Sequence, residues 1–304
     1  RMKGPFDEPP FEHFHISPLK LREKGVTGKY RLLHNLSWPY DGISSVNTGI
    51  DQDSKSVKYS SVTIAIALIM AYPRGSLTSK SDLQDAFKIV PIHPDDHHKL
   101  GIKYNGKYYY DITLPMGCAS ACQIFEAIST ALHAIHVFDT EQGTLHYLDD
   151  FFFIDTDLLK AQDNKMAFDT LCNDVGIPQA PHKITQPAFV TEFLGIELDS
   201  ENWVARLPLA KVIAYLAHIK DLLLKNRVTQ RELQSIIGKL SFCTLVVPAR
   251  PFLRRLISRI HTVKKQHHHI AVTAQMKQDL HIWIHFLNHY NGITYFRAFN
   301  IVTG

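Results

Sequence analysis

Three stretches in the first two hundred residues have the spacing of helices. The run at 61–72, SVTIAIALIMAY, is almost continuously apolar and is closed by Pro73 and Gly75, which predicts a buried helix. At 120–137 apolar residues recur every three or four positions, which predicts a helix with one face turned into the protein. The stretch 157–174 is also predicted to be helical.

Strand-like runs separate these helices. Residues 77–92, LTSKSDLQDAFKIVPI, predict a strand that runs into a tight helical turn. Asn105-Gly106 lies between two β-rich arms and predicts a hairpin over 99–114. Residues 144–155, TLHYLDDFFFID, predict two short apolar strands around a turn at Leu148-Asp149.

The two ends of the chain differ in pattern. Residues 1–57 are turn-rich, with one short strand-like run. Further along the chain, EFLGIEL at 192–198 predicts another strand. From about 208 onward the pattern is helical throughout, and Thr229-x-x-Glu232 is a capping-box signature that opens a helix. Mixed strands and helices followed by helices alone predict the α+β fold class with a helical C-terminal lobe.

Composition narrows the class of protein. With 304 residues, 45% of them hydrophobic and 20% charged, the chain can bury a core, which excludes disorder over most of its length. The apolar run at 62–72 is shorter than the ~20 residues of a membrane helix, so no membrane partner is expected. No signal peptide and no initiator Met are visible, which favours an intracellular fragment, cytoplasmic or nuclear and not secreted.

Cysteine and histidine do not form a recognisable metal pattern. The four cysteines include a single C-x₃-C pair, Cys118 and Cys122, so reduced thiols are preferred over a zinc site. The 18 histidines, His267–His269 among them, lack the spacing of known metal motifs and are interpreted as surface or core residues.

Charge is distributed unevenly along the chain. Residues 1–200 hold 18 Lys and Arg against 25 Asp and Glu, a net of −7, whereas residues 201–265 hold 13 against 3, a net of +10. An acidic body with a basic lobe suggests metal chemistry in the first and a polyanion at the second. On charge alone, a solvated basic face explains the lobe equally well.

The tetrapeptide YLDD, Tyr147 to Asp150, is the sharpest chemical signal. Two adjacent aspartates in a turn between apolar strands would be desolvated and would repel one another unless a divalent cation neutralised them. Adjacent strand residues point to opposite faces, so a third carboxylate is expected, and Asp82, at the end of another apolar strand, is the best candidate. Asp85 is better placed to cap or brace the following turn. The alternative is an ordinary surface turn.

The order of motifs resembles the palm of reverse transcriptases. SDLQDAF resembles the first catalytic strand, LPMGCASACQIF the loop and helix after it, YLDD the Y-x-D-D signature, and EFLGIEL the primer-grip strand. The phrases KYRLLHNLSWPYDGISSVN, PIHPDD and FLGIELDS are most similar to the reverse transcriptases of DIRS- and Ngaro-like retrotransposons, which carry a tyrosine recombinase. The resemblance runs from about residue 5 to 295.

The resemblance implies a right-hand polymerase fold of fingers, palm and thumb, with an antiparallel palm sheet that carries YLDD. It implies that the fingers are 1–57 and 92–113, the palm 58–91 and 114–200, the basic helical thumb 201–265, and the start of a connection region 266–304, with no ribonuclease H domain.

The resemblance also implies roles for single residues. Catalysis and the binding of two Mg²⁺ ions, for which Mn²⁺ can substitute, fall to Asp82, Asp149 and Asp150, with Lys183 as the acid that protonates pyrophosphate. Arg31, with Lys29, would contact the triphosphate, and Met116 and Gly117 would border the nucleotide. Phe87 would lie beneath the sugar as the steric gate against a ribose 2′-OH. The primer grip would be Phe193, Leu194 and Gly195, and the thumb cations that contact the primer–template would be Arg250, Arg254, Arg255 and Arg259.

Two positions depart from the family pattern. Met116 stands where retroviral enzymes have a polar Gln, and Cys122 stands where many relatives have a Pro. Taken without the resemblance, Arg31 is better explained as a surface charge and Phe87 as a core aromatic, whereas a solvated lysine explains Lys183 equally well. The sequence carries no signal for the oligomeric state.

The sequence therefore predicts an RNA-directed DNA polymerase whose partners are dNTPs and an RNA or DNA primer–template. A domesticated, inactive relative that binds nucleic acid or serves as a scaffold is the alternative, against which the intact aspartates argue. An RNA-dependent RNA polymerase is a second rival, against which Phe87 argues, because such an enzyme must admit the 2′-OH.

Overall fold

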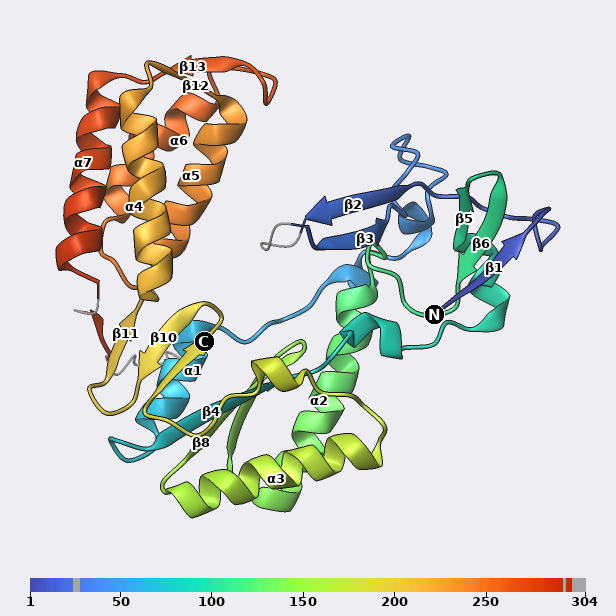
Figure 1. The fold of residues 1–304 in the computed structure, drawn as a ribbon, viewed down its shortest axis with the longest axis horizontal. Helices are drawn as coiled ribbons and strands as arrows, with labels where there is room; N and C mark the ends of the chain where they lie inside the picture. The colour runs from blue at the N-terminus through green and yellow to red at the C-terminus, as the bar shows by residue number, and fades with distance from the viewer. Residues whose placement is uncertain (24–27, 292–293, 297–304) are drawn as a thin grey trace. The chain divides into compact units, whose positions relative to one another are not determined.

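A computed structural model describes residues 1–23, 28–291 and 294–296 (Figure 1). The chain divides into two compact units. The first comprises residues 1–60, 80–153 and 162–186, and the second comprises 61–79, 154–161 and 187–304. The expected connection region, 266–304, lies partly outside the described residues.

The N-terminal part of the first unit is built of small antiparallel sheets. Strand β1 (Met2–Phe6) pairs with β6 (Lys107–Asp111), which pairs with β5 (Gly101–Tyr104). Asn105 and Gly106 join β5 to β6 with φ values of 50° and 74°, which confirms the hairpin predicted from this Asn-Gly pair. Strand β2 (Leu19–Glu23) pairs with β3 (Tyr30–His34) over all five residues.

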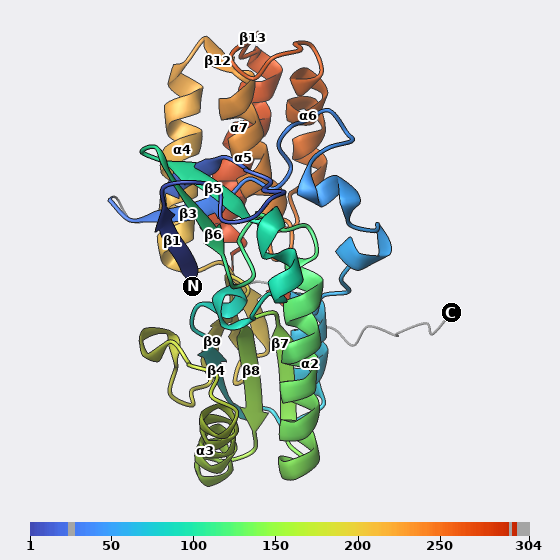
Figure 2. The same ribbon diagram turned by 90° about the vertical axis from the view of Figure 1, so that its right-hand side faces the viewer.

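A further three-stranded sheet has the order β4-β8-β7. Its strands are β4 (Leu77–Asp82), β7 (Gly143–Tyr147) and β8 (Asp150–Asp155). Helix α2 (Ala121–Thr140) packs along β7, as Figure 2 shows, and helix α3 (Leu158–Asp174) follows β8. Short 3₁₀ turns connect these parts: η1 (Val46–Gly49), η2 (Asp53–Lys55), η3 (Ala86–Ile89), η4 (Pro94–Lys99) and η5 (Pro181–Lys183).

Phenylalanines fill the core between this sheet and its helices. The alternating Phe151 and Phe153 of β8 point to one face, where they meet Phe125 and Leu132 of α2 and Phe168 of α3. All five side chains are at most 3% exposed. Burial of such rings is worth roughly 2–3 kcal/mol each, so the apolar side of the YLDD segment is firmly anchored.

The second unit contains helix α1 (Val62–Met70) and a sheet of order β14-β11-β10-β9. The strands are β9 (Val190–Phe193), β10 (Ile196–Asp199), β11 (Val204–Arg206) and β14 (Thr294–Tyr295). EFLGIEL was expected to be one strand, and this is wrong. Leu194 and Gly195, with φ values of 48° and 82°, turn the chain between β9 and β10. A glycine inside a strand pattern is a turn signal, and here it outweighs the apolar run.

A helical bundle completes the second unit (Figure 1). It contains α4 (Leu209–Leu224), α5 (Gln230–Cys243), η6 (Arg250–Leu253), α6 (Arg254–Ile260) and α7 (Ala274–His289). The capping box at the start of α5 is confirmed, because Thr229 and Glu232 exchange hydrogen bonds with each other's backbone N–H groups.

The pattern after residue 208 predicted helices alone, and this is wrong for the bundle. Strands β12 (Arg227–Thr229) and β13 (His269–Ala271) pair with each other. Three-residue strands are too short to show a period of two in the sequence. The expected thumb boundary at 265 falls within this bundle, since β13 pairs with β12 and α7 packs against α4.

Helix α2 is the one described helix that is long and apolar enough, by length and composition, to cross a membrane. This is weak support for a span, because the core helices of soluble proteins pass the same test. Its inward face carries Phe125 and Leu132 in the phenylalanine core, whereas Ile135 and Phe138 are exposed. All four cysteines are free thiols.

Candidate active site

The turn at Leu148-Asp149 lies beside the end of β4. Strands β7 and β8 are neighbours on either side of this turn, and β4 lies on the other side of β8. The backbone N–H of Leu83 donates a 2.8 Å hydrogen bond to the carbonyl oxygen of Asp149. This bond brings Asp82, which precedes Leu83 directly, close to Asp149, although 67 positions separate the two in sequence.

The carboxylates of this group carry negative charge that is poorly compensated. Burial raises the pKa of Asp149 above its ordinary value, and the charge of Asp82 raises it further. Burial raises the pKa of Asp150 to about 6, against the lowering effect of nearby Lys80. Asp82 itself is 8% exposed. Three acidic groups in one buried place are unfavourable without positive charge, so the site is suited to cations.

Lys183 supplies one positive charge. Its Nζ lies 2.7 Å from Oδ2 of Asp82, and its side chain is 47% exposed. The segment around η5 runs beside β4, because the N–H of Ala180 donates to the carbonyl of Asp82 and the N–H of Thr185 to that of Lys80. Lys183 is therefore held at the site although 101 positions separate it from Asp82 in sequence.

The donor chemistry of these carboxylates fits a hard divalent cation. Oδ1 of Asp150 is buried and has no hydrogen-bond partner among the described residues. Carboxylate oxygens are the ligands that Mg²⁺ prefers. Within the described ranges, however, no three acidic, histidine or cysteine side chains already converge as metal ligands, and the Lys183 ammonium occupies one oxygen of Asp82.

The residues expected to meet the nucleotide lie on separate segments of the first unit. Arg31 is exposed on β3, and its positive charge acts on Asp149 and lowers that carboxyl's pKa in part. Lys29 is exposed just before β3. Phe87 lies in η3 and makes an edge-to-face contact with Phe125, with ring centroids 5.8 Å apart. Phe87 is partly buried and packs against the phenylalanine core.

Gly117 makes a close backbone approach that the sequence could not identify. Its φ is 127°, and a Cβ atom at this position would lie 1.9 Å from the carbonyl oxygen of His34. The N–H of His34 also donates to the carbonyl of Met116 at 2.9 Å. The approach therefore joins the Met116-Gly117 segment to the end of β3, the strand that carries Arg31.

Several residues of this region were not found by sequence reasoning. The side chain of Asn47 donates to the carbonyl of Gly117 and accepts from the N–H of Ala119, both at 2.8 Å. Lys80, two positions before Asp82 and hence on the same face of β4, is the charge that acts on Asp150. An Asn in an irregular segment and a Lys inside a strand carry no signal of their own.

Asp85 does not cap the turn after β4 with its side chain, as the sequence suggested. Its carboxylate instead forms an ion pair with Arg1, in which Nη2 of Arg1 lies 2.6 Å from Oδ2 of Asp85. The backbone of Asp85 adopts a φ of 56°. The N-terminal arginine could not be assigned to this partner from sequence, because the pairing spans 84 positions.

The expected primer-grip residues lie in the second unit. Phe193 is fully buried at the end of β9, and Leu194 and Gly195 form the turn to β10. Lys211 of α4 fixes this turn, because its Nζ donates to the carbonyl of Gly195 at 2.7 Å and to Glu192 at 2.9 Å. Lys211 was not identified from the sequence.

The four predicted thumb cations are exposed on η6 and α6. Arg250 and Arg254 line a cavity of about 480 Å³ together with Ser241 of α5 and Thr244, the residue that follows this helix. Arg255 differs from them, since its Nη1 lies 3.3 Å from the buried Asp279 of α7. Two of the four cations therefore border an open hollow, and one is part of the bundle's own structure.

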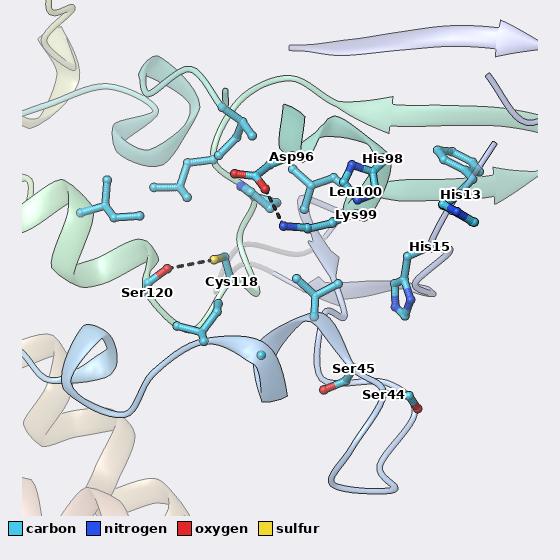
Figure 3. Close-up of a pocket in the computed structure, with 18 residues that line it drawn as sticks. His13, His15, Ser44, Ser45, Asp96, His98, Lys99, Leu100, Cys118 and Ser120 are labelled. Atoms are coloured by element: carbon cyan, nitrogen blue, oxygen red, sulfur yellow. Dashed lines mark hydrogen bonds and ion pairs between the residues drawn. The ribbon is translucent and has the colours of Figure 1, made fainter. Parts of the chain in front are cut away.

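A separate cavity of about 530 Å³ lies in the first unit (Figure 3). Its wall is largely apolar, and His15, His98 and Lys99 add polar groups to it. Lys99 pairs with Asp96 at 2.7 Å. None of the three aspartates discussed above lines this cavity.

Comparison with known sequences gives one partial match. No family model matches the chain. It is 26% identical over 189 residues to the Gag-Pro-Pol polyprotein of Mason-Pfizer monkey virus, a match that covers 58% of this chain. The chain spans about 10% of the length of that polyprotein.

Solved structures of the foamy viral protease-reverse transcriptase share the fold. A complex with double-stranded DNA has a TM-score of 0.70 at 19% identity and covers 91% of this chain and 44% of that chain. A complex with an RNA/DNA hybrid has the same TM-score and identity and covers 93% and 35%. The chain therefore has a mixed α/β fold similar to these structures over most of its length.

Proposed function

We propose that this chain is the polymerase unit of a reverse transcriptase. It would join dNTPs to the 3′-OH of a primer on an RNA or DNA template. The observation that carries the proposal is the pair Asp82 and Asp149, which lie side by side, the first buried and the second partly buried, with Lys183 beside them, in a fold similar to that of reverse-transcriptase proteins.

Asp82, Asp149 and Asp150 would hold two Mg²⁺ ions, which Mn²⁺ could replace. When bound, such ions stabilise the attacking and leaving oxygens of an in-line phosphoryl transfer. The chain itself contributes positioning, because β4 and the Leu148-Asp149 turn fix the carboxylates before substrate arrives. Lys183 would release Asp82 and donate its Nζ proton to the departing pyrophosphate oxygen.

The exposed guanidinium of Arg31, with Lys29 nearby, would bind the triphosphate, for which its planar fork is suited. Met116 and Gly117 would border the nucleotide, and Phe87 would lie beneath its sugar. A ring at this position leaves no room for a 2′-OH, so deoxynucleotides would be selected.

The turn at Phe193, Leu194 and Gly195 would contact the primer, and the basic bundle would bind the backbone of the duplex. Arg250, Arg254, Arg255 and Arg259 are the cations proposed for this contact, which reads shape and charge rather than base sequence.

We also propose the DIRS- and Ngaro-like class of retrotransposon as the source of the chain. This rests on the phrases KYRLLHNLSWPYDGISSVN, PIHPDD and FLGIELDS alone. A genomic copy of the element tests it: a tyrosine recombinase reading frame beside this one supports the class, and an integrase of the retroviral type in its place contradicts it.

Primer extension tests the polymerase proposal. The protein is incubated with a 5′-labelled DNA primer on an RNA template, Mg²⁺ and dNTPs, and the same reaction is run with Asp149→Asn as the matched control. Extension by the wild type alone supports the proposal. Hybrid binding without extension by the wild type favours the alternative, an inactive relative that binds nucleic acid.

A further inference from the structure

Strand β3, which carries Arg31, is held to the rest of the first unit mainly at its last residue. Among the five described residues of this strand only His34 is buried, whereas the first three, Arg31 among them, are exposed. Strand β2, which pairs with β3, is exposed over its last four residues. The packing that fixes the Arg31 hairpin is therefore concentrated at its His34 end.

Two acceptor atoms face the ring of His34. Nδ1 lies 3.1 Å from Oδ2 of Asp111, and Nε2 lies 3.2 Å from the carbonyl oxygen of Gly101. The other carboxylate oxygen of Asp111 accepts from Nζ of Lys88 at 3.1 Å. A carbonyl oxygen only accepts, and a carboxylate paired with an ammonium group likewise accepts. Both ring nitrogens therefore donate, so His34 is a buried imidazolium, with a side chain 2% exposed.

The backbone of His34 contacts the segment expected to border the nucleotide. Its N–H donates to the carbonyl oxygen of Met116 at 2.9 Å. Its own carbonyl oxygen lies where a Cβ atom on Gly117 would be 1.9 Å away, so only glycine allows this approach. One residue thus joins β3 to the β5-β6 hairpin through its ring and to the Met116-Gly117 segment through its backbone.

The ion group and Met116 also share a small cavity. His34, Lys88, Asp111 and Met116 line a space of about 120 Å³. Arg1 is the other charged side chain in this wall, and its guanidinium pairs with a carboxylate elsewhere. Loss of the His34 ring would therefore enlarge the space beside Met116 and leave Asp111 with Lys88 as its described cation.

We propose that His34 is a positioning residue for the incoming dNTP. Held by its two acceptors, it fixes the end of β3 against the Met116-Gly117 segment and so sets the position of the Arg31 guanidinium, three residues earlier on the strand. The proposal rests on the polymerase function proposed above, because that function assigns Arg31 and the Met116-Gly117 segment to the nucleotide. His34 itself makes no contact with substrate in this role.

Steady-state kinetics with matched variants test the role. His34→Leu removes both donors, and we expect the KM for dNTP to rise at least tenfold, while kcat falls less than threefold and the Kd for the hybrid stays within twofold. His136→Leu, which replaces another buried histidine of the same unit, is the control. It should lower the melting temperature and leave the KM within twofold. An unchanged KM in His34→Leu means that the ring serves the fold alone, and it overturns the proposal.

Variants of Asp111 test the same link should His34→Leu fail to fold. In Asp111→Asn the amide oxygen can accept from Lys88 and the amide NH₂ can donate to a neutral His34 ring, so we expect a KM within threefold of the wild type. Asp111→Leu leaves Nδ1 of His34 without its acceptor and should raise the KM as much as His34→Leu does. Equal KM values in the Asn and Leu variants contradict the proposal.

A double-mutant cycle tests whether His34 acts through Arg31. In an Arg31→Ala background there is no guanidinium to position, so we expect His34→Leu to change the KM for dNTP by less than twofold. A tenfold change in that background means that His34 acts in another way, and the proposal fails.

An amide measurement separates this inference from the question of activity. In NMR spectra of the whole chain, the His34 amide, which donates to Met116, should exchange with solvent at least tenfold faster in Asp111→Leu than in the wild type, while amides of β8 stay unchanged. This result is expected even if the wild type does not extend primers, in which case only the polymerase proposal fails. Unchanged exchange at His34 overturns the inference whatever the activity.

Discussion

The N–H of Leu83 and the carbonyl oxygen of Asp149 are joined by a 2.8 Å hydrogen bond. Through it, the end of β4 and the turn before β8 are fixed to each other, and the carboxylates of Asp82 and Asp149 are placed together before any cation binds. As a consequence, burial raises the pKa of Asp149 and of Asp150, and the charges of the neighbouring carboxylates raise both further.

Stability without metal should depend on the proton of Asp150. Its pKa in the folded protein, about 6, lies above the ordinary 3.8, so the folded state keeps this proton to higher pH than the unfolded state. Below pH 4 the carboxyl of Asp150 is protonated in both states and does not lower the free energy of unfolding. Between pH 4 and 6 the free energy of unfolding falls, and above pH 6 the full reduction is present.

Asp150→Asn removes that cost, and in EDTA we expect it to raise the free energy of unfolding by about 2 kcal/mol at pH 7, with no gain at pH 4. Urea unfolding at the two pH values measures the difference. A gain of equal size at both would show that the charge of Asp150 is not its cause.

Sugar selection should depend on the ring of Phe87. Phe87→Val shortens the side chain beside the proposed sugar position, and we expect ribonucleotide incorporation relative to deoxynucleotide to rise at least tenfold. Competition of rNTPs with dNTPs in primer extension measures the ratio. Because Phe87 also packs on Phe125, the melting temperature is measured alongside. A loss of stability with unchanged sugar selection would mean that the ring serves the core alone.

The arginines proposed to contact the duplex should separate into two kinds. Arg254→Ala and Arg259→Ala each remove an exposed charge, so each should reduce the slope of log K against log salt by about one per lost phosphate contact, with little change in melting temperature. Arg255→Ala should lower the melting temperature more, since it leaves the buried Asp279 without its cation. Hybrid binding at several salt concentrations and thermal unfolding give both quantities, and equal melting temperatures for all three variants would contradict the distinction.

Local signals in the sequence were sufficient for much of the fold. Asn105-Gly106 determines its hairpin because both residues accept positive φ, and Thr229 with Glu232 marks the start of α5 because a capping box is formed within four residues. The apolar spacing at 120–137 likewise predicted α2, which spans Ala121–Thr140. In each case the physical cause lies within a few residues of its effect.

The parts that could not be predicted depend on distant partners. The side chain of Asn47 donates a hydrogen bond to the carbonyl of Gly117, 70 positions away. Lys211 donates to the carbonyl of Gly195 in the turn after β9, and Arg1 pairs with the Asp85 carboxylate, which therefore does not cap the turn after β4. Glu126 and His146 show no motif, because their contact exists only once α2 packs on β7. The turn at Leu194-Gly195 is the exception, since its glycine was a readable signal.

Primer extension on an RNA template, with Mg²⁺ and dNTPs, tests the central claim most directly. The account predicts that the wild type extends the primer, that Asp149→Asn lowers the rate by at least a thousandfold, and that both bind an RNA/DNA hybrid with affinities within threefold. Synthesis by Asp149→Asn at the wild-type rate would contradict the role of the aspartates. Absence of synthesis by the wild type, with the hybrid bound, would contradict the assignment of polymerase activity to this chain.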